Sequence, residues 1–213
     1  RLTDEEVAFI EIECKPYLEF VDSKLTILDG SWTPDKMLAF ITQNLKNTNS
    51  QTFTNIVIVD TTNAIGADSG QSKVEALKKW NQEYCLQILR NEKNTANILL
   101  QQQDKNSSTR QYTNRGESVM DKYKPTLEGL GGDKESANSA NLVLSLYNPL
   151  TFGEGELDGY YPSNFEGGFR MLYVNKNNFG DVNLTFPYYF NGKTGIWTPI
   201  DEGPEEFRKQ KSL

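Results

Sequence analysis

Residues 55–60 read Asn55-Ile56-Val57-Ile58-Val59-Asp60, a run of four β-branched apolar residues that ends in an acid. A continuous apolar run of this length is typical of a strand that is buried on both faces of a parallel sheet. Open α/β sheets bind their ligands at the carboxyl ends of such strands, which is the place that Asp60 occupies. The run therefore predicts an α/β fold with a ligand site beside Asp60.

Two interpretations of Asp60 remain open at this point. In proteins that hydrolyse nucleotides with a phosphate-binding loop, an Asp at the end of a buried strand holds the magnesium ion beside the phosphates. Alternatively, Asp60 only caps a turn, because Thr61, Thr62 and Asn63 follow it. A motif this short does not by itself decide between a metal ligand and a turn.

Composition limits the classes of function. The chain has 213 residues, enough for one large domain or two small ones, and a formal net charge of −7. That charge argues against a protein coated in basic residues for duplex DNA. The chain has no histidine, which excludes Ser-His-Asp and Cys-His nucleophiles and histidine zinc sites. Its two cysteines need no disulfide framework, so we expect a cytoplasmic protein, and no apolar stretch is long enough for a membrane span.

The order of expected elements predicts the architecture. Helical spacing of apolar residues alternates with short apolar runs in the first half, which calls for a parallel sheet with crossover helices. The second half alternates apolar and polar residues between turns rich in Asn and Gly, as in an antiparallel meander. The expected helices are 4–14, 34–45 and 73–92, and the expected strands are 24–28, 55–60, 96–100, 142–147, 169–174, 182–186 and 195–199.

A long polar segment, residues 104–128, separates the two halves. Between Lys105 and Lys124 it carries five basic and two acidic residues, a net charge of +3 in a chain that totals −7. A loop of this length inside a compact domain is usually functional or disordered. The alternative is an ordinary solvated loop.

The ordered set of motifs resembles the C-terminal, RecA-like motor domain of DnaB-type replicative helicases, in a divergent form like those of phages or mobile elements. The resemblance covers most of the chain. It rests on the strand that ends at Asp60, Ala76-Leu77-Lys78, Ile98-Leu99-Leu100-Gln101-Gln102, Lys124-Pro125, Leu130-Gly131-Gly132-Asp133-Lys134, the strand 140–146, and Val174-Asn175-Lys176-Asn177-Asn178-Phe179-Gly180.

The resemblance implies a RecA-like, mostly parallel sheet flanked by helices over residues 1–200, with a C-terminal antiparallel meander and an acidic tail at 201–213. It also implies ATP and Mg²⁺ as cofactors, single-stranded DNA as a partner, and a ring of subunits. Asp60 would hold the magnesium ion, Gln102 would sense the γ-phosphate, and Lys176 would reach the nucleotide of the neighbouring subunit. The residues expected to face DNA are Lys105, Arg110, Arg115, Lys122 and Lys124.

Two departures from the family pattern affect the expected activity. The phosphate-cradling G-x-x-x-x-G-K-[ST] motif is absent, because Gly192-Lys193-Thr194 lacks the upstream glycine and reads as a turn. Either the chain is truncated before Arg1 or the protein is a degenerate homologue. Asn178 stands where the family has its arginine finger and carries no charge for a phosphate. We therefore expect no ATP hydrolysis by this chain alone.

Two other functions compete with a helicase motor. The first is a RecA-like module that has lost its ATPase activity and binds single-stranded DNA or a replication partner. The second is an extracellular ligand-binding β domain, suggested by the Tyr- and Asn-rich second half. The βα pattern of the first half and the lack of a visible signal peptide argue against the second.

Overall fold

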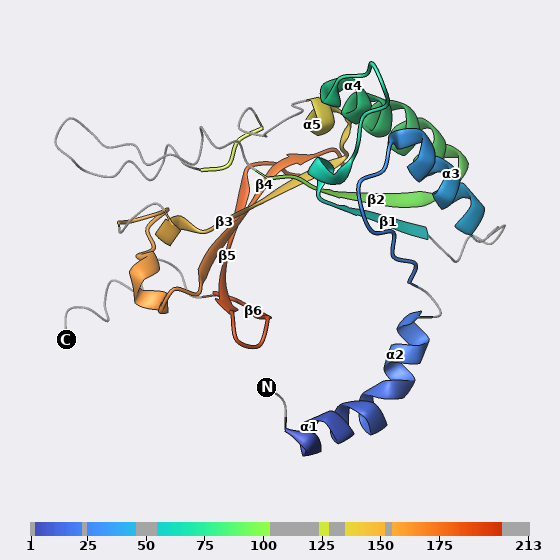
Figure 1. Ribbon diagram of the computed structural model, residues 1–213. Coiled ribbons are helices and arrows are strands. Elements are labelled where there is room, and N and C mark those ends of the chain that lie inside the picture. The colour runs from blue at the N-terminus through green and yellow to red at the C-terminus, as the bar shows by residue number, and fades with distance from the viewer. Residues whose placement is uncertain are drawn as a thin grey trace, which may run out of the picture. The chain divides into compact units, whose positions relative to one another are not determined.

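The computed structural model describes residues 3–22, 25–45, 55–102, 124–127, 135–151 and 155–201 (Figure 1). The chain forms two compact units, residues 1–31 and 32–213, and each is described by itself. The predicted boundary between a core at 1–200 and a tail at 201–213 stays a prediction, since only Asp201 of that tail lies within the described residues.

The first unit is helical. It contains α1 (Asp4–Phe9), a π-helical turn (Ile10–Cys14) and α2 (Lys15–Asp22). The helix begins as the sequence predicts, at a capping box in which Glu6 N donates to Thr3 Oγ1 and Thr3 N donates to the Glu6 carboxylate at 2.7 Å. This pairing lowers the pKa of Glu6, chiefly through the bond from the Thr3 backbone.

The second unit begins with a parallel strand pair, β1 (Asn55–Asp60) and β2 (Thr95–Leu100), in which Asp60 lies opposite Leu100. Three helical segments cover one face of this pair: α3 (Pro34–Asn44), α4 (Lys73–Lys78) and its π-helical continuation η3 (Lys79–Glu92) (Figure 1). The core between them holds Val59, Ile65, Leu77, Trp80, Tyr84, Cys85 and Leu89. The predicted helix over 73–92 and both strands are thus present.

The opposite face of the parallel pair differs from the prediction. Ile56 and Ile58 are 63% and 61% exposed, whereas Val59 is 6% exposed. Ile98 and Leu100 on β2 are also exposed. Strand side chains alternate between faces, so burial on both sides needs a second covering layer. No described segment supplies that layer, so the expectation of a strand buried on both faces is wrong for the described chain.

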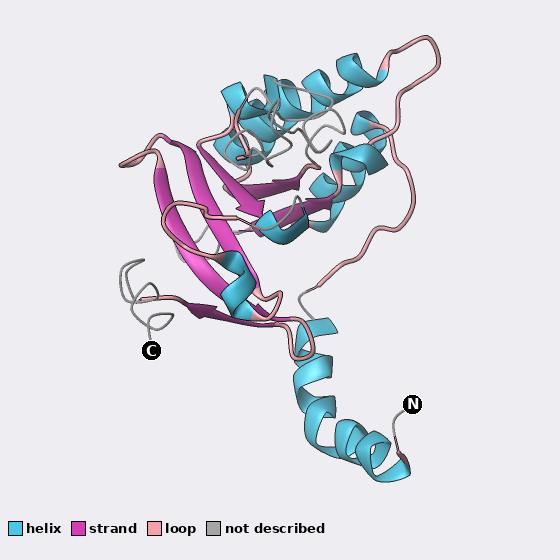
Figure 2. Ribbon diagram, turned by 90° about the vertical axis from the view of Figure 1, so that its left-hand side faces the viewer, coloured by secondary structure: helices cyan, strands magenta, loops and turns pink. Residues whose placement is uncertain are grey.

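The remaining strands form one antiparallel sheet in the order β3 (Leu142–Tyr147), β4 (Phe169–Asn177), β5 (Leu184–Asn191) and β6 (Ile196–Pro199) (Figure 2). The predicted C-terminal meander is therefore present, and β3 joins it. Of the strand pairs in the described residues, one is parallel and three are antiparallel. The described strands thus form an α/β arrangement but not a mostly parallel sheet.

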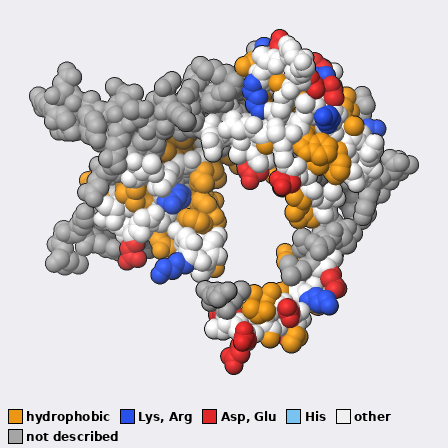
Figure 3. Space-filling model, in the orientation of Figure 1, with side chains coloured by type: hydrophobic (Ala, Val, Ile, Leu, Met, Phe, Trp, Pro, Cys, Tyr) orange, Lys and Arg blue, Asp and Glu red, His pale blue; other side chains and the backbone are white. Residues whose placement is uncertain are grey.

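One face of this sheet has its own apolar core. It holds Tyr147, Leu157, Tyr160, Phe169, Met171 and Tyr173, under the short helical turns Pro149–Thr151 and Pro162–Phe165. Leu142, Leu144 and Leu146 of β3 are exposed, as are Leu184 and Phe186 of β5. Figure 3 shows apolar side chains gathered beneath β1 and beside β5. Both sheets of this unit therefore carry apolar side chains that the described residues leave uncovered, an arrangement typical of interaction surfaces.

The smaller elements of the described structure include the 3₁₀ turn Thr62–Ala64, the helix α5 (Glu135–Ser139), and isolated bridges between Trp32 and Ile65 and between Leu157 and Tyr160. The strand expected at 24–28 is not formed by residues 25–28. None of the helices within the described ranges combines the length and apolar character that crossing a membrane requires.

Candidate functional site

Asp60 ends β1 on its exposed face. The side-chain alternation that buries Val59 places Asp60 with Ile56 and Ile58, and its own side chain is exposed. The carboxylate thus adjoins the uncovered apolar surface rather than the helices. An exposed carboxylate at this place is accessible to a ligand.

Gln102 lies two residues beyond the end of β2. Because β1 and β2 are parallel neighbours, their carboxyl ends meet at one edge of the pair, as the sequence predicts. Gln102 is exposed there. The strands that carry Asp60 and Gln102 are therefore side by side, while the roles of magnesium ligand and γ-phosphate sensor stay predictions.

Asp60 fits a magnesium site only in part. Among the described residues no three His, Cys, Asp or Glu side chains come together in a group that could hold a metal ion. Magnesium is often bound through one or two carboxylates, with waters and the phosphate oxygens of a nucleotide as its other ligands. A lone Asp60 is compatible with that chemistry, provided that a nucleotide is bound beside it.

Lys176 is engaged within its own chain. Its ammonium group donates hydrogen bonds to the carbonyl oxygens of Ala137 at 2.9 Å and Asn138 at 2.8 Å, near the carboxyl end of α5. The last carbonyls of a helix lack intrahelical partners and favour a cation. To act on a neighbour's nucleotide, Lys176 would have to leave these carbonyls, so its role in trans stays a prediction.

We expect Lys176→Met to lower the free energy of unfolding of the isolated chain by about 1–3 kcal/mol, the usual size for hydrogen bonds to a charged group. Urea denaturation followed by circular dichroism measures this change. Lys193→Met is the matched control, because Lys193 is exposed and its side chain has no partner among the described residues. Equal stability of the two variants would show that the Lys176 contacts do not hold α5.

Of the five residues expected to face DNA, the structure describes one, Lys124. Lys105, Arg110, Arg115 and Lys122 lie outside the described residues. Lys124 pairs with Asp158, its Nζ lying 2.6 Å from the Asp158 carboxylate. Tyr173 Oη donates to the other oxygen of that carboxylate at 3.4 Å. The charge of Lys124 is therefore balanced within the fold, which weakens the prediction that it faces DNA.

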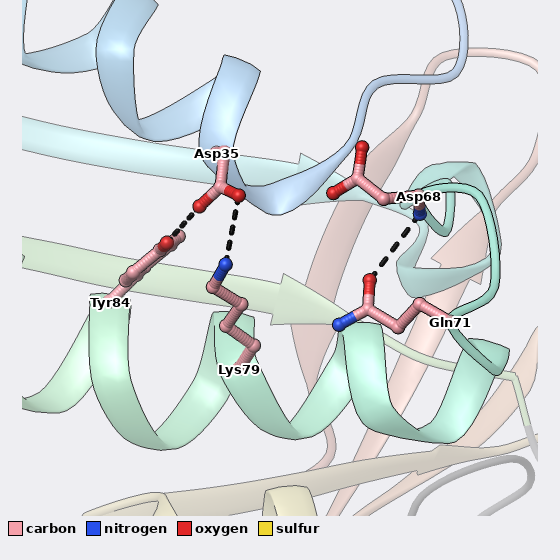
Figure 4. Close-up of polar contacts among 5 residues, drawn as sticks. All are labelled: Asp35, Asp68, Gln71, Lys79 and Tyr84. Carbon is pink, nitrogen blue, oxygen red and sulfur yellow. Dashed lines mark hydrogen bonds and ion pairs between the residues drawn. The ribbon is translucent and has the colours of Figure 1, made fainter.

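The structure also shows a polar cluster between α3 and η3 that the sequence did not reveal. Asp35, at the start of α3, accepts hydrogen bonds from Lys79, at 2.8 Å, and from Tyr84 of η3 (Figure 4). The bond from Lys79, followed by that from Tyr84, lowers the pKa of Asp35. The contact with Asp35, followed by that with Tyr84, raises the pKa of Lys79 above its usual range. This cluster fastens α3 to the helix that covers the strands.

Lys73 fastens the segment that follows Asp60. Its ammonium group donates to the carbonyl oxygens of Asn63, at 2.9 Å, and Ile65. Partial burial lowers the pKa of Lys73. Helical spacing placed Lys73 at a helix start, but no local signal predicted that it would reach back to the turn after β1. It acts as a support for the edge that carries Asp60.

Comparison with known proteins gives a likeness of fold. No protein family and no curated protein sequence matches the chain. Its structure is similar to a chain in the solved structure of a DnaB-like replicative helicase and its interactions with primase, with a TM-score of 0.67 and 16% sequence identity. The match covers 94% of this chain and 43% of that chain, so this chain spans less than half the length of the helicase chain. At this identity the likeness establishes the fold but not the activity, which has to be inferred from the residues of the site.

Proposed function

We propose that this chain is the motor-domain part of a DnaB-like replicative helicase that couples ATP hydrolysis to translocation along single-stranded DNA and to duplex unwinding. The observation that supports the proposal is the parallel pairing of the strands that precede Gln102 and end at Asp60, in a fold similar to that of a DnaB-like helicase. A RecA-like strand order, a ring of subunits and a cytoplasmic location belong to the same proposal.

The roles of the residues follow from the requirements of phosphoryl transfer. Catalysis of this reaction depends on positioning and on stabilising charge on the phosphate oxygens. Asp60 would hold Mg²⁺ directly or through water, and the ion would neutralise part of the charge on the β- and γ-phosphates. Gln102 would report the presence of the γ-phosphate to the segment that follows it, which contains the proposed DNA-facing residues.

The phosphate cradle itself would come from a polypeptide segment outside these 213 residues. The sequence contains no G-x-x-x-x-G-K-[ST] motif. Among the described residues, β2 and β3 each pair with one other strand. Each of these two strands therefore has a second edge with no strand partner in the described part of the chain. The exposed apolar face beside Asp60 would then be covered by the segment that carries the cradle. Such a segment would bring backbone amides and a lysine close to the carboxylate.

ATP turnover tests this proposal. We expect no single-stranded-DNA-stimulated hydrolysis by the 213-residue chain, and clear hydrolysis by a longer natural polypeptide that contains it. In that longer protein Asp60→Asn should lower kcat by about a hundredfold or more, the usual loss when a charge-stabilising group is removed. Asp201→Asn, at an exposed carboxylate beyond β6, is the control and should leave kcat unchanged. Turnover by the short chain that Asp60→Asn abolishes would contradict the need for an outside cradle.

A second function is favoured by the same missing motif and by Asn178. A RecA-like module without ATPase activity would bind single-stranded DNA or a replication partner. If the longest natural polypeptide contains no phosphate-binding motif, or binds DNA without hydrolysing ATP, this second function replaces the first.

A further inference from the structure

A hollow of about 400 Å³ lies at one end of the antiparallel sheet, away from Asp60 in the sequence. The residues just before β4, including Glu166 and Gly168, line one side of it. The end of β5 and the turn that follows, including Phe190 and Lys193, line the other. Its volume falls within the range of sites for small molecules and single nucleotides.

Two cations line this hollow. Arg170 Nη1 donates to the carbonyl oxygens of Gly167 at 2.9 Å and Phe169 at 2.7 Å, and the guanidinium carbon lies 5.5 Å from the centroid of the Phe190 ring. These contacts hold the guanidinium in place and leave Nε and Nη2 without partners among the described residues. Lys193 is exposed, and its ammonium group has no partner among the residues that the structure describes. Both cations can therefore bind an anion.

Aromatic rings adjoin the cations. The Phe190 ring lies 4.6 Å from that of Trp197 on β6, measured between centroids, and Trp197 is 41% exposed. Tyr189 packs over the backbone at Gly168, where an added Cβ would clash with its ring. Exposed aromatic rings beside cations are the usual means by which proteins hold unpaired bases, because the rings stack on bases and the cations follow the phosphates.

One acid opposes the two cations. Glu166 lines the same hollow, is exposed, and has no side-chain partner among the described residues. The hollow thus has a net charge of +1, and its carboxylate would repel a phosphate that approaches Lys193. Removing this charge and removing that of Lys193 should therefore change the affinity for an anion in opposite directions.

We propose that this hollow binds one nucleotide of a DNA single strand, its phosphate contacting Lys193 and the free N–H groups of Arg170, and its base stacking on the Phe190–Trp197 surface. The choice of a single strand as ligand rests on the proposed function, whereas the charges and rings are properties of the described chain. None of the residues that line the hollow belongs to the segment 104–128, so the site would give the strand a further point of contact.

The test uses the purified 213-residue chain and a short oligodeoxythymidylate at low salt. The indole N–H resonance of Trp197, observed by NMR, should shift in a saturable way, whereas that of the fully buried Trp80 should not. Inorganic phosphate at the same phosphate concentration is the second probe and should give a weaker shift. Absence of a Trp197 shift with the oligonucleotide, or an equal shift with free phosphate, would overturn the proposal.

Charge variants sharpen the test. Lys193→Gln should weaken binding and reduce the magnitude of its logarithmic salt slope by about 0.7, the value for one phosphate contact on a single strand. Glu166→Gln should strengthen binding, and Lys36→Gln, at an exposed lysine of α3, should leave it unchanged. Identical affinities for all three variants would refute the site. If these three variants bind with equal affinity and a variant lacking Lys105, Arg110 and Arg115 binds more weakly, the proposed helicase function stands and this site does not.

Discussion

Replacing Val59 by lysine should unfold the second unit of this chain, whereas lysine at Ile58, one residue earlier, should leave the unit folded. Val59 is 6% exposed and packs in the core with Leu77 and Trp80. An unpaired ammonium group in such a core costs several kcal/mol, a large part of the about 5–15 kcal/mol that stabilises a domain. Ile58 points to the opposite, exposed face, where a substitution changes stability by about 0.5 kcal/mol.

Circular dichroism and urea denaturation of the two variants measure this difference. If Ile58→Lys unfolds the isolated chain as Val59→Lys does, then the face that carries Asp60 is covered. The same pair gives a second result in a longer polypeptide that carries the phosphate cradle. There Ile58→Lys should destabilise the protein strongly, because the segment proposed to cover Ile58 would have to bury the charge.

Trp80→Ala should lower the free energy of unfolding by about 3–5 kcal/mol, the usual cost of truncating a buried tryptophan. Trp80 belongs to η3 and is fully buried in the core between the helices and the parallel strands, and its ring contacts that of Tyr84 edge-on. Removing the indole leaves a cavity that neighbouring helices and strands can only partly fill.

Trp197→Ala is the matched control for this prediction. Trp197 is partly exposed on the terminal strand β6, so its truncation should cost about 1 kcal/mol or less. The measurement is the shift in urea midpoint for each variant at constant slope. A loss of stability for Trp197→Ala as large as that for Trp80→Ala would mean that Trp197 is packed as closely as a core residue.

Local sequence patterns predicted several elements correctly. The run 55–60 forms β1, the apolar run after the long helix forms β2, and alternation in the second half predicted the antiparallel meander. These features depend on backbone preference and on the spacing of apolar side chains, which a single segment contains. The adjacency of the strands that carry Asp60 and Gln102 followed from the βαβ order, because crossover connections join parallel neighbours.

Only the tertiary structure decided which side chains of these elements are covered. The helical spacing of Val74 and Leu77 predicts that both lie on the inner side of the helix expected at 73–92, yet Val74 is exposed and Trp80 is buried in the core instead. The apolar run at 55–60 predicted two buried faces, yet one is open, because a strand's sequence does not specify whether a second layer packs on it. Lys176 binds carbonyls of α5, 38 and 39 residues earlier, and Asp35 binds Lys79 and Tyr84, 44 and 49 residues later. Such contacts join distant segments, so they arise only when the chain packs and carry no local signal.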